Sequence, residues 1–228
     1  NAIADVLTGK VNPSGKLAST FPVKYEDVPS AKNFPGKELV GQKPLINSPL
    51  AGKPAEVIYE EGIFVGYRFY KTFSVKTSFE FGFGLSYTDF SYSNLKLSAK
   101  NFNKEITATV KITNIGKIAG KESVQLYLSA PSASLPKPES ELKAFAKTDL
   151  LQPGKSQVLT FKIKPENLAS FDTAKSAWIA EKGNYKVKIG ASSLNIKQTA
   201  NFVLKNDLVV EKVNNVLAPK VKIDEFKK

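Results

Sequence analysis

A series of short segments with alternating apolar and polar residues occupies the second half of this chain, and turn signals such as Asn114-Ile115-Gly116 and Gln152-Pro153-Gly154 lie between them. This alternation is typical of strands with one buried and one solvated face, and no long window has a helical period. The predicted strands are residues 106–112, 124–128, 158–163, 178–179, 185–189 and 202–204. Seven or so short strands within about 110 residues predict a β-sandwich, with its last strand at 202–204.

Three residue types are absent from the 228 residues: Cys, His and Met. Without Cys or His the chain cannot hold a zinc finger, an iron–sulfur cluster, a disulfide or a Ser–His triad. The length predicts one or two domains, and the hydrophobic content of 42% is enough for a packed core. No stretch approaches the roughly 20 apolar residues that span a bilayer, and no signal peptide is visible.

The chain opens with Asn1 and contains no Met. A primary translation product begins with Met, and a residue as large as Asn behind it would normally hinder its removal. We therefore expect the chain to be part of something longer: a processed product, a proteolytic fragment or a truncated chain.

The net charge of +12 raises the question of a nucleic-acid partner. Nearly all of the positive charge is Lys, with Arg68 the only arginine, whereas bidentate recognition of phosphates and guanine edges favours Arg. Lysines that alternate with apolar residues, among them Lys162, Lys164, Lys186 and Lys188, are expected on solvated strand faces. We predict solubilising surface lysines and no nucleic-acid partner.

The first part of the chain has a different pattern. Residues 1–10 place apolar side chains on one helical face and stop at Gly9, which predicts the end of a helix that Asn1 could cap. A turn at 11–17 and a short extended piece at 19–22 are expected next. Residues 22–54 are rich in Pro, Gly and Lys with little periodicity, so we expect a long loop that wraps a neighbour or carries a function.

Residues 59–92 contain twelve aromatic side chains, half of the 8 Tyr, 15 Phe and 1 Trp in the chain. Large rings supply buried area at a low entropic cost, so we interpret this segment as a seam between two parts of the molecule. The alternative is sugar stacking, and a minority of the rings could border a ligand pocket. Trp178 is expected in the core of the sandwich, with carbohydrate binding as the alternative.

Several segments, in order along nearly the whole chain, resemble the C-terminal part of glycoside hydrolase family 3, the β-glucosidase and β-xylosidase family. The resemblance rests on residues 2–17 (AIADVLTGKVNPSGKL), 59–70 (YEEGIFVGYRFY), 81–88 (FGFGLSYT), 114–120, 125–127, 141–154 and 178–190. Glu80 stands where the family usually has Pro. One glycine-rich motif would be weak, but ordered blocks with compatible spacing are specific.

The resemblance implies a full protein with an N-terminal TIM-like barrel, an α/β sandwich and a fibronectin type III-like domain. This chain would hold the C-terminal remnant of the α/β sandwich domain with its aromatic linker (1–89), the fibronectin type III-like domain (90–204) and a tail that packs back on the body (205–228). The fold class is therefore predicted to be mainly β, a fibronectin type III-like (immunoglobulin-like) β-sandwich preceded by that remnant.

The function implied is that of a retaining β-glycosidase, most simply a β-glucosidase, that hydrolyses terminal non-reducing β-linked sugars. In the family the nucleophilic Asp lies in the barrel and the general acid/base Glu lies upstream of the segment that matches Asn1. The expected partners are therefore this N-terminal catalytic portion, covalently attached or as a second chain, and a glycoside substrate. The resemblance also suggests a periplasmic or secreted location. The alternative is a non-catalytic carbohydrate- or protein-binding module, because a fold alone does not decide function.

We assign no catalytic, cofactor-binding or metal-binding residue, and the chain alone is predicted to be inactive. Adjacent acids on an extended chain point to opposite faces, so Glu60 and Glu61 make a poor catalytic pair, and Glu61 is expected to be a structural partner of Arg68. Gly82 and Gly84 are expected to allow tight turning beside bulky rings, since no phosphate-binding motif follows them.

Four aspartates, Asp5, Asp27, Asp89 and Asp172, are too scattered along the sequence to predict a metal site. No cofactor is expected either, since the chain contains no dinucleotide fingerprint.

Overall fold

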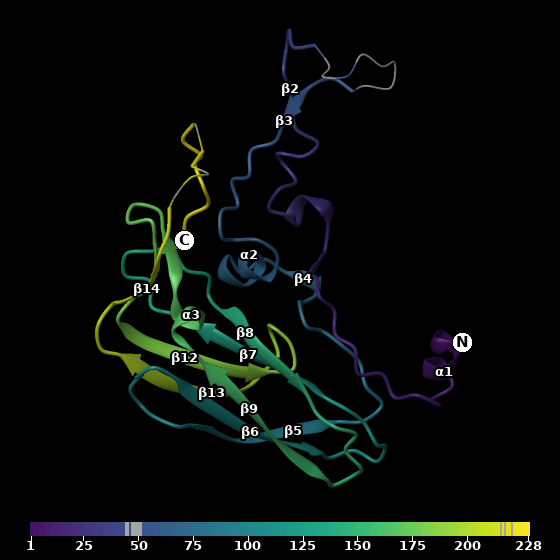
Figure 1. The fold of residues 1–228 in the computed structure, drawn as a ribbon. Coiled ribbons are helices and arrows are strands. Elements are labelled where there is room, and N and C mark those ends of the chain that lie inside the picture. Colours follow the sequence, from purple (N-terminus) through teal and green to yellow (C-terminus); the bar gives the residue numbers. More distant parts are fainter. Residues whose placement is uncertain (44–45, 47–51, 215, 217, 220) are drawn as a thin grey trace.

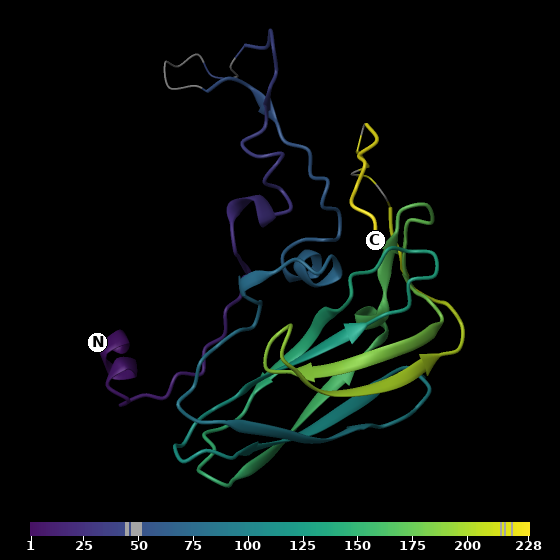
Figure 2. The ribbon, with the colours of Figure 1, turned by 180° about the vertical axis from the view of Figure 1, so that it is seen from behind.

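The computed structural model describes residues 1–43, 46, 52–214, 216, 218–219 and 221–228. Residues 90–204 form a β-sandwich of two antiparallel sheets with strand orders β13-β12-β7-β8 and β5-β6-β9 (Figures 1 and 2). The strands are β5 (Phe90–Leu97), β6 (Ile106–Asn114), β7 (Ser123–Ser129), β8 (Glu141–Lys147), β9 (Ser156–Ile163), β12 (Gly183–Gly190) and β13 (Ile196–Leu204). The predicted β-sandwich and mainly-β fold class are confirmed.

The core lies between the two sheets and follows the alternation in the sequence. Every second side chain of β6 from Ile106 to Ile112 is inaccessible to solvent. On the opposite sheet, the ring of Tyr185 in β12 stacks on Phe202 in β13, with centroids 5.3 Å apart and planes 7° apart. Burial of large apolar side chains from both sheets is the main source of the stability of this domain.

A smaller sheet, with strand order β10-β11-β14, lies at one end of the sandwich beside the short helix α3 (Pro165–Leu168). Its strands are β10 (Ser170–Asp172), β11 (Ala177–Ala180) and β14 (Leu208–Lys212). The prediction that residues 178–179 belong to the sandwich is therefore wrong, and so is the prediction that the last strand ends at Leu204. Both errors have the same cause: β14 pairs with β11 in the small sheet, and neither segment taken alone indicates that the two strands pair.

Trp178 is not in the core, contrary to expectation. Its neighbours Ala177 and Ile179 face inward and are buried, so the pleat of β11 turns Trp178 outward, where 42% of it is exposed. The indole packs on the ring of Phe171 across the β10–β11 pair, with centroids 5.5 Å apart.

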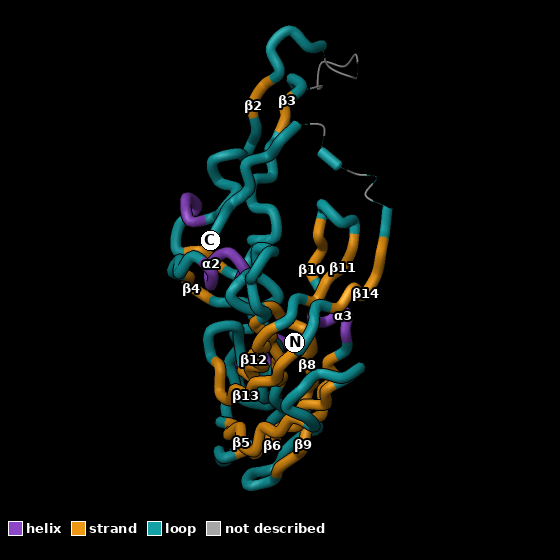
Figure 3. Tube along the Cα trace, turned by 90° about the vertical axis from the view of Figure 1, so that its left-hand side faces the viewer, coloured by secondary structure: helices purple, strands orange, loops and turns teal. Residues whose placement is uncertain are grey.

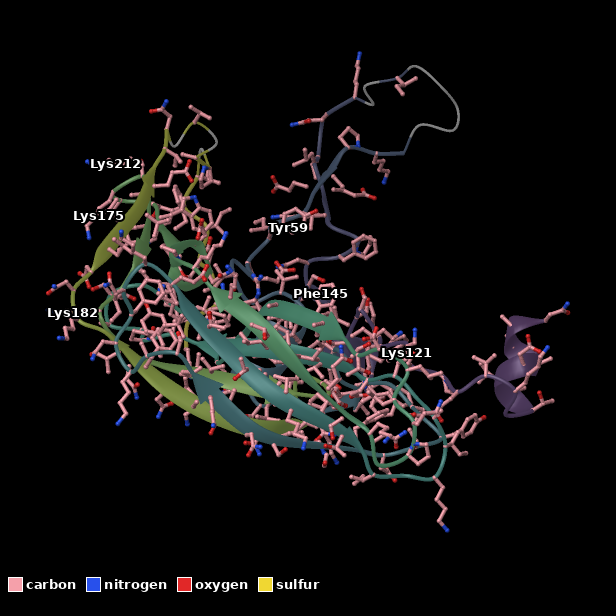
Figure 4. All side chains as sticks on the ribbon, turned by 60° about the horizontal axis from the view of Figure 1, so that its bottom comes forward. Tyr59, Lys121, Phe145, Lys175, Lys182 and Lys212 are labelled. Carbon is pink, nitrogen blue, oxygen red and sulfur yellow. The ribbon has the colours of Figure 1, made fainter. Side chains whose placement is uncertain are left out.

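The expected surface position is correct for Lys162, Lys164 and Lys186, which are exposed on their strands, and wrong for Lys188. Lys188 lies in the middle of β12, between β7 and β13, and is 8% exposed. Its ammonium group is paired with Glu139 from the loop that leads into β8. Labelled lysines of the outer strands and loops, such as Lys175 and Lys182, project outward in Figure 4.

The chain before the sandwich is less compact and extends away from it (Figures 1 and 3). Its elements are α1 (Ala2–Leu7), β1 (Phe21–Pro22), the 3₁₀ turn η1 (Tyr25–Asp27), β2 (Lys37–Glu38), β3 (Ala55–Glu56), α2 (Tyr67–Thr72) and β4 (Thr77–Phe79). The helix predicted near the start is confirmed and ends before Gly9, whose φ is +74°, but the Asn1 side chain does not cap it. The expected loop at 22–54 contains η1 and β2, and β2 pairs with β3 to form an arm; residues 44–45 and 47–51 of this prediction lie outside the described residues.

Among the residues that the structure describes, no helix combines the length and the apolar character needed to cross a bilayer.

Candidate functional site

The predicted aromatic seam joins α2 to the sandwich. The ring of Tyr67 in α2 stacks on Phe81 at a centroid distance of 4.6 Å and meets Tyr127 of β7 edge-on at 6.0 Å. Its hydroxyl oxygen also accepts a hydrogen bond from the backbone N–H of Leu142 in β8, at 2.7 Å. One side chain therefore contacts the segment that precedes β5 and two strands of the sandwich, which confirms the seam at its centre.

A second group of rings surrounds the outer face of α2 and includes a residue from the end of the chain. Phe69 and Phe73 pack against each other at 5.2 Å, and both contact Phe226. The backbone N–H of Phe226 donates to the carbonyl oxygen of Glu60 at 2.9 Å. The sequence predicted a tail at 205–228 that packs back on the body, of which residues 215, 217 and 220 lie outside the described residues. It did not predict this particular contact, because an isolated Phe near a lysine-rich end has no recognisable period.

Not all aromatic residues of 59–92 belong to the seam. Tyr59 is 72% exposed on the stem of the arm, where Figure 4 labels it, and Phe79 and Tyr87 are about half exposed. These rings lie on the surface of the N-terminal part, so they are open to a partner.

Polar contacts hold the same two parts together. Asn12 donates to the carbonyl oxygen of Ala119 at 3.0 Å, and its own side-chain oxygen accepts from the backbone N–H of Tyr87 at 2.8 Å. Lys16 pairs with Glu122 at 3.2 Å, and the Tyr92 hydroxyl donates to the same carboxylate oxygen at 2.7 Å. The Asn-Pro-Ser-Gly segment around Asn12 therefore anchors the N-terminal part on the sandwich.

Ion pairs form beside the seam where the loop before β8 reaches α2. Glu139 pairs with Lys188 of β12 and, at 3.2 Å, with Lys71 of α2. Burial alone would raise the pKa of Glu139, but the hydrogen bond from Lys188 and the charge of Lys71 outweigh it and bring that pKa down to about 2. Burial is also the main reason that the pKa of Lys71 is lowered.

Arg68 pairs with Glu141, not with Glu61. The Arg68 Nε atom lies 3.4 Å from Glu141 Oε1, so the predicted Glu61–Arg68 pair is wrong. The reason is the turn at Glu60–Gly62: the carbonyl of Glu61 accepts from the N–H of Phe64, and α2 directs Arg68 toward the start of β8.

Glu61 instead lines a cavity of about 440 Å³ between residues 18–30 and the turn before α2. It is 7% exposed, and its Oε2 atom has no hydrogen-bond partner among the described residues. Thr20 Oγ1, in the wall of the same cavity, is also buried without a partner. Glu60 lines a different cavity of about 430 Å³ beside Phe73 and Phe226, so the two adjacent acids do not face one space.

The rest of the N-terminal part exposes an unusual amount of apolar surface. Large apolar side chains that are at least about half exposed lie along α1, β1, the arm and the turn before α2: Ile3, Leu7, Val11, Phe21, Val23, Tyr25, Phe34, Val40, Ile58, Tyr59 and Val65. Large exposed apolar areas mark interaction sites, and these exposed side chains are gathered in the N-terminal part of the chain. The candidate functional site is therefore this surface, with the Glu61 cavity inside it; we call it the docking face.

No metal site is found in the part of the chain that the structure describes, where no three Asp or Glu side chains gather closely enough to hold an ion. The scattered aspartates have local roles instead. Asp172, for example, accepts from the N–H groups of Ala174 and Lys175 in the turn between β10 and β11.

Fold and site together define a class of protein: a fibronectin type III-like domain to which the last part of a second domain is fastened. Two family models agree with this division. The model of the glycosyl hydrolase family 3 C-terminal domain matches residues 1–67, and that of the fibronectin type III-like domain matches residues 122–193.

The individual proteins that are similar to this chain belong to one family. The thermostable β-glucosidase B of Acetivibrio thermocellus is 44% identical over 86% of this chain, and β-glucosidase BoGH3A of Bacteroides ovatus is 44% identical over 88%. The structure of β-glucosidase 3B from Thermotoga neapolitana in complex with α-D-glucose matches 90% of the chain with 45% identity and a TM-score of 0.79. The chain belongs to glycoside hydrolase family 3 and corresponds to its C-terminal part. It spans about a quarter of the length of these relatives: 24% and 25% of the two sequences and 26% of the solved chain.

Proposed function

We propose that this chain is the C-terminal portion of a retaining β-glucosidase that removes terminal non-reducing β-linked glucose, and that the upstream portion of the protein supplies the catalytic carboxyl groups. The observation that carries the proposal is the combination of 44–45% identity to β-glucosidases over most of the chain with an exposed apolar docking face. Retaining glycosidases use two carboxyl groups about 5 Å apart. We assign neither of them to this chain.

The proposed role of the chain is to fasten and complete the catalytic portion. The seam at Tyr67 and the ion pairs of Glu139 hold residues 1–89 on the sandwich, and this support fixes the docking face in position. Burial of the exposed apolar residues against the upstream portion would stabilise the assembly by the usual ~25 cal/mol per Å² of apolar surface. We further propose a periplasmic or secreted location.

The test is complementation between two chains. This chain is mixed with the upstream three quarters of β-glucosidase 3B from Thermotoga neapolitana, and hydrolysis of p-nitrophenyl β-D-glucoside and β-D-xyloside is measured. We expect each chain alone to be inactive and the mixture to prefer the glucoside. Turnover by the isolated chain would show that it holds catalytic carboxyl groups of its own and would refute this part of the proposal. An inactive mixture in which the two chains also fail to form a complex would refute the docking role.

A second candidate function is carbohydrate binding by the sandwich itself. Its support is the half-exposed Trp178, whose ring lies beside that of Phe171 on the small sheet, since flat aromatic surfaces bind the C–H faces of sugars. Titration of the isolated chain with cello-oligosaccharides while the fluorescence of Trp178, the only tryptophan, is followed separates this candidate from the first.

A further inference from the structure

The carboxylate of Glu61 is a buried polar group on the docking face. Glu61 is 7% exposed, and its Oε2 atom is buried and lacks a hydrogen-bond partner among the described residues. A buried, ionised carboxylate is strongly destabilising unless a donor or a cation compensates it. Native proteins leave few such groups unpaired, so the missing partner is expected to come from outside the described residues, and we look for it in the upstream portion of the protein.

The cationic side chains of the neighbouring seam already have partners. Arg68 pairs with Glu141, and Lys71 donates to the carbonyl oxygen of Ser193 at 2.7 Å and pairs with Glu139. No ion pair joins Glu61 to any lysine or to Arg68 within the described residues. The charge of Glu61 is therefore not neutralised by the part of the chain that surrounds it.

A second unpartnered atom lies in the same cavity. The Thr20 hydroxyl is buried without a partner, and the walls between Thr20 and Glu61 include the rings of Tyr67 and Tyr70. A carboxylate, a hydroxyl acceptor and aromatic faces together form a set of groups that suits a cationic side chain, above all the planar, multiply donating guanidinium group of arginine. The volume of about 440 Å³ leaves room for such a side chain.

We propose that the Glu61 cavity is a socket for a cationic side chain, arginine by preference, that the upstream portion of the protein inserts on docking. This proposal rests on the proposed function, because it names the chemistry by which the upstream portion recognises the docking face. The side chain would donate to Glu61 Oε2 and Thr20 Oγ1 while the exposed Val65 packs against the apolar surface around it. A neutral sugar in the cavity would leave the charge of Glu61 uncompensated, so we favour a cation.

The experiment compares this chain with its Glu61→Gln variant, which keeps the size of the side chain and removes the charge. Binding to the upstream three quarters of the Thermotoga neapolitana enzyme is measured by titration calorimetry. We expect Glu61→Gln to weaken binding at least tenfold, because the inserted cation would then be buried without a counter-charge. The control is Glu26→Gln, an exposed acid near the same surface, which we expect to change binding less than twofold.

Thermal unfolding of the isolated chain supplies the second readout. If Glu61 lacks a partner within the chain, Glu61→Gln leaves the melting temperature unchanged or raises it. A lower melting temperature would show an internal structural partner and overturn the proposal. Equal binding by the wild-type and Glu61→Gln chains would also overturn the proposal. Stabilisation by glucose of the wild-type chain but not of the variant would overturn it too, because the cavity would then be a sugar site. If the wild-type chain does not bind the upstream portion at all, the proposed function fails and the socket fails with it.

Discussion

Gln125 of β7 fills the space beside Gly82 that a side chain would otherwise occupy. The Gln125 amide donates to the carbonyl oxygen of Gly82 at 3.2 Å and to that of Ala191 at 2.8 Å. A Cβ atom on Gly82 would lie 2.1 Å from Gln125 Oε1, and the backbone of Gly82 has a φ of +82°. Glycine is therefore required here for two independent reasons, the left-handed backbone and the close approach of the sandwich.

The first prediction concerns this contact. Gly82→Ala should lower the free energy of unfolding by about 2–4 kcal/mol, because both backbone strain and overpacking oppose it. Gly154, with a φ of +75° and no atom within 4 Å of its Cβ position, is the matched control and isolates the strain. Gly154→Ala should cost only about 1–2 kcal/mol. Urea denaturation measures both, and equal losses would contradict the role given to Gln125.

The second prediction concerns the pH dependence of stability. The pKa of Glu139 is lowered to about 2 in the folded chain, below the ordinary 4.5. Its contribution is therefore fully present above about pH 4.5 and is lost as the pH falls from there toward 2, and it amounts to about 2–3 kcal/mol. Glu139→Gln should remove this part of the pH dependence and destabilise the chain at pH 7, while Glu166→Gln on the exposed side of α3 should do neither. Urea denaturation at pH 7, 4 and 2.5 provides the comparison.

The third prediction concerns Asn114 at the end of β6. Its side chain is inaccessible to solvent, donates to the carbonyl oxygens of Ile118 and Leu151 at 2.8 Å, and accepts from the Thr88 hydroxyl at 2.7 Å. Asn114→Leu keeps a similar size but leaves these groups unpaired, so it should cost about 3–4 kcal/mol. Asn201→Leu on the exposed face of β13 should change stability by less than about 0.5 kcal/mol. Thermal unfolding of the two variants at one protein concentration measures the difference in stability. A small loss of stability in Asn114→Leu would mean that water replaces the hydrogen bonds of the amide.

The fourth prediction compares Trp178 with Phe202. Phe202 is 1% exposed in the core, so Phe202→Ala should cost about 3–5 kcal/mol, whereas Trp178→Ala on the outer face of β11 should cost about 1 kcal/mol. A loss at Trp178 as large as that at Phe202 would restore the core position that the sequence suggested. Chemical denaturation followed by circular dichroism is suitable, because it does not depend on the indole signal.

The outward position of Trp178 illustrates how far sequence patterns reach in this chain. Alternation located the strands of the sandwich, since a period of two is a local property of a half-buried strand. It could not say which sheet a strand joins or which face of a short strand is covered, because both depend on the partner strand. For β11 that partner is β14, which lies 28 residues further on and was not predicted as a strand.

The charged residues show the same difference between what the sequence predicts and what depends on remote partners. The sequence correctly predicted an aromatic seam around Tyr67, and it correctly predicted that the side chains of Glu60 and Glu61 do not face one site. The ordered motifs led to the family. The pairing of Arg68 with Glu141, the burial of Lys188 and the lack of a partner for Glu61 Oε2 among the described residues were not foreseen. Each involves groups more than 40 residues apart, or the lack of any such partner, and sequence spacing carries no information about either.

What the sequence by itself determined is the kind of structure and the family: a β-sandwich follows from local alternation, and the ordered motifs identify glycoside hydrolase family 3. What only the tertiary structure decided is which charges are compensated and which surface is left uncovered. Ion pairs and exposed apolar patches depend on distances between remote segments, and these become fixed only when the sheets, α2 and the end of the chain pack together. The docking face and the Glu61 cavity are therefore properties of the folded chain, although every residue in them can be read in the sequence.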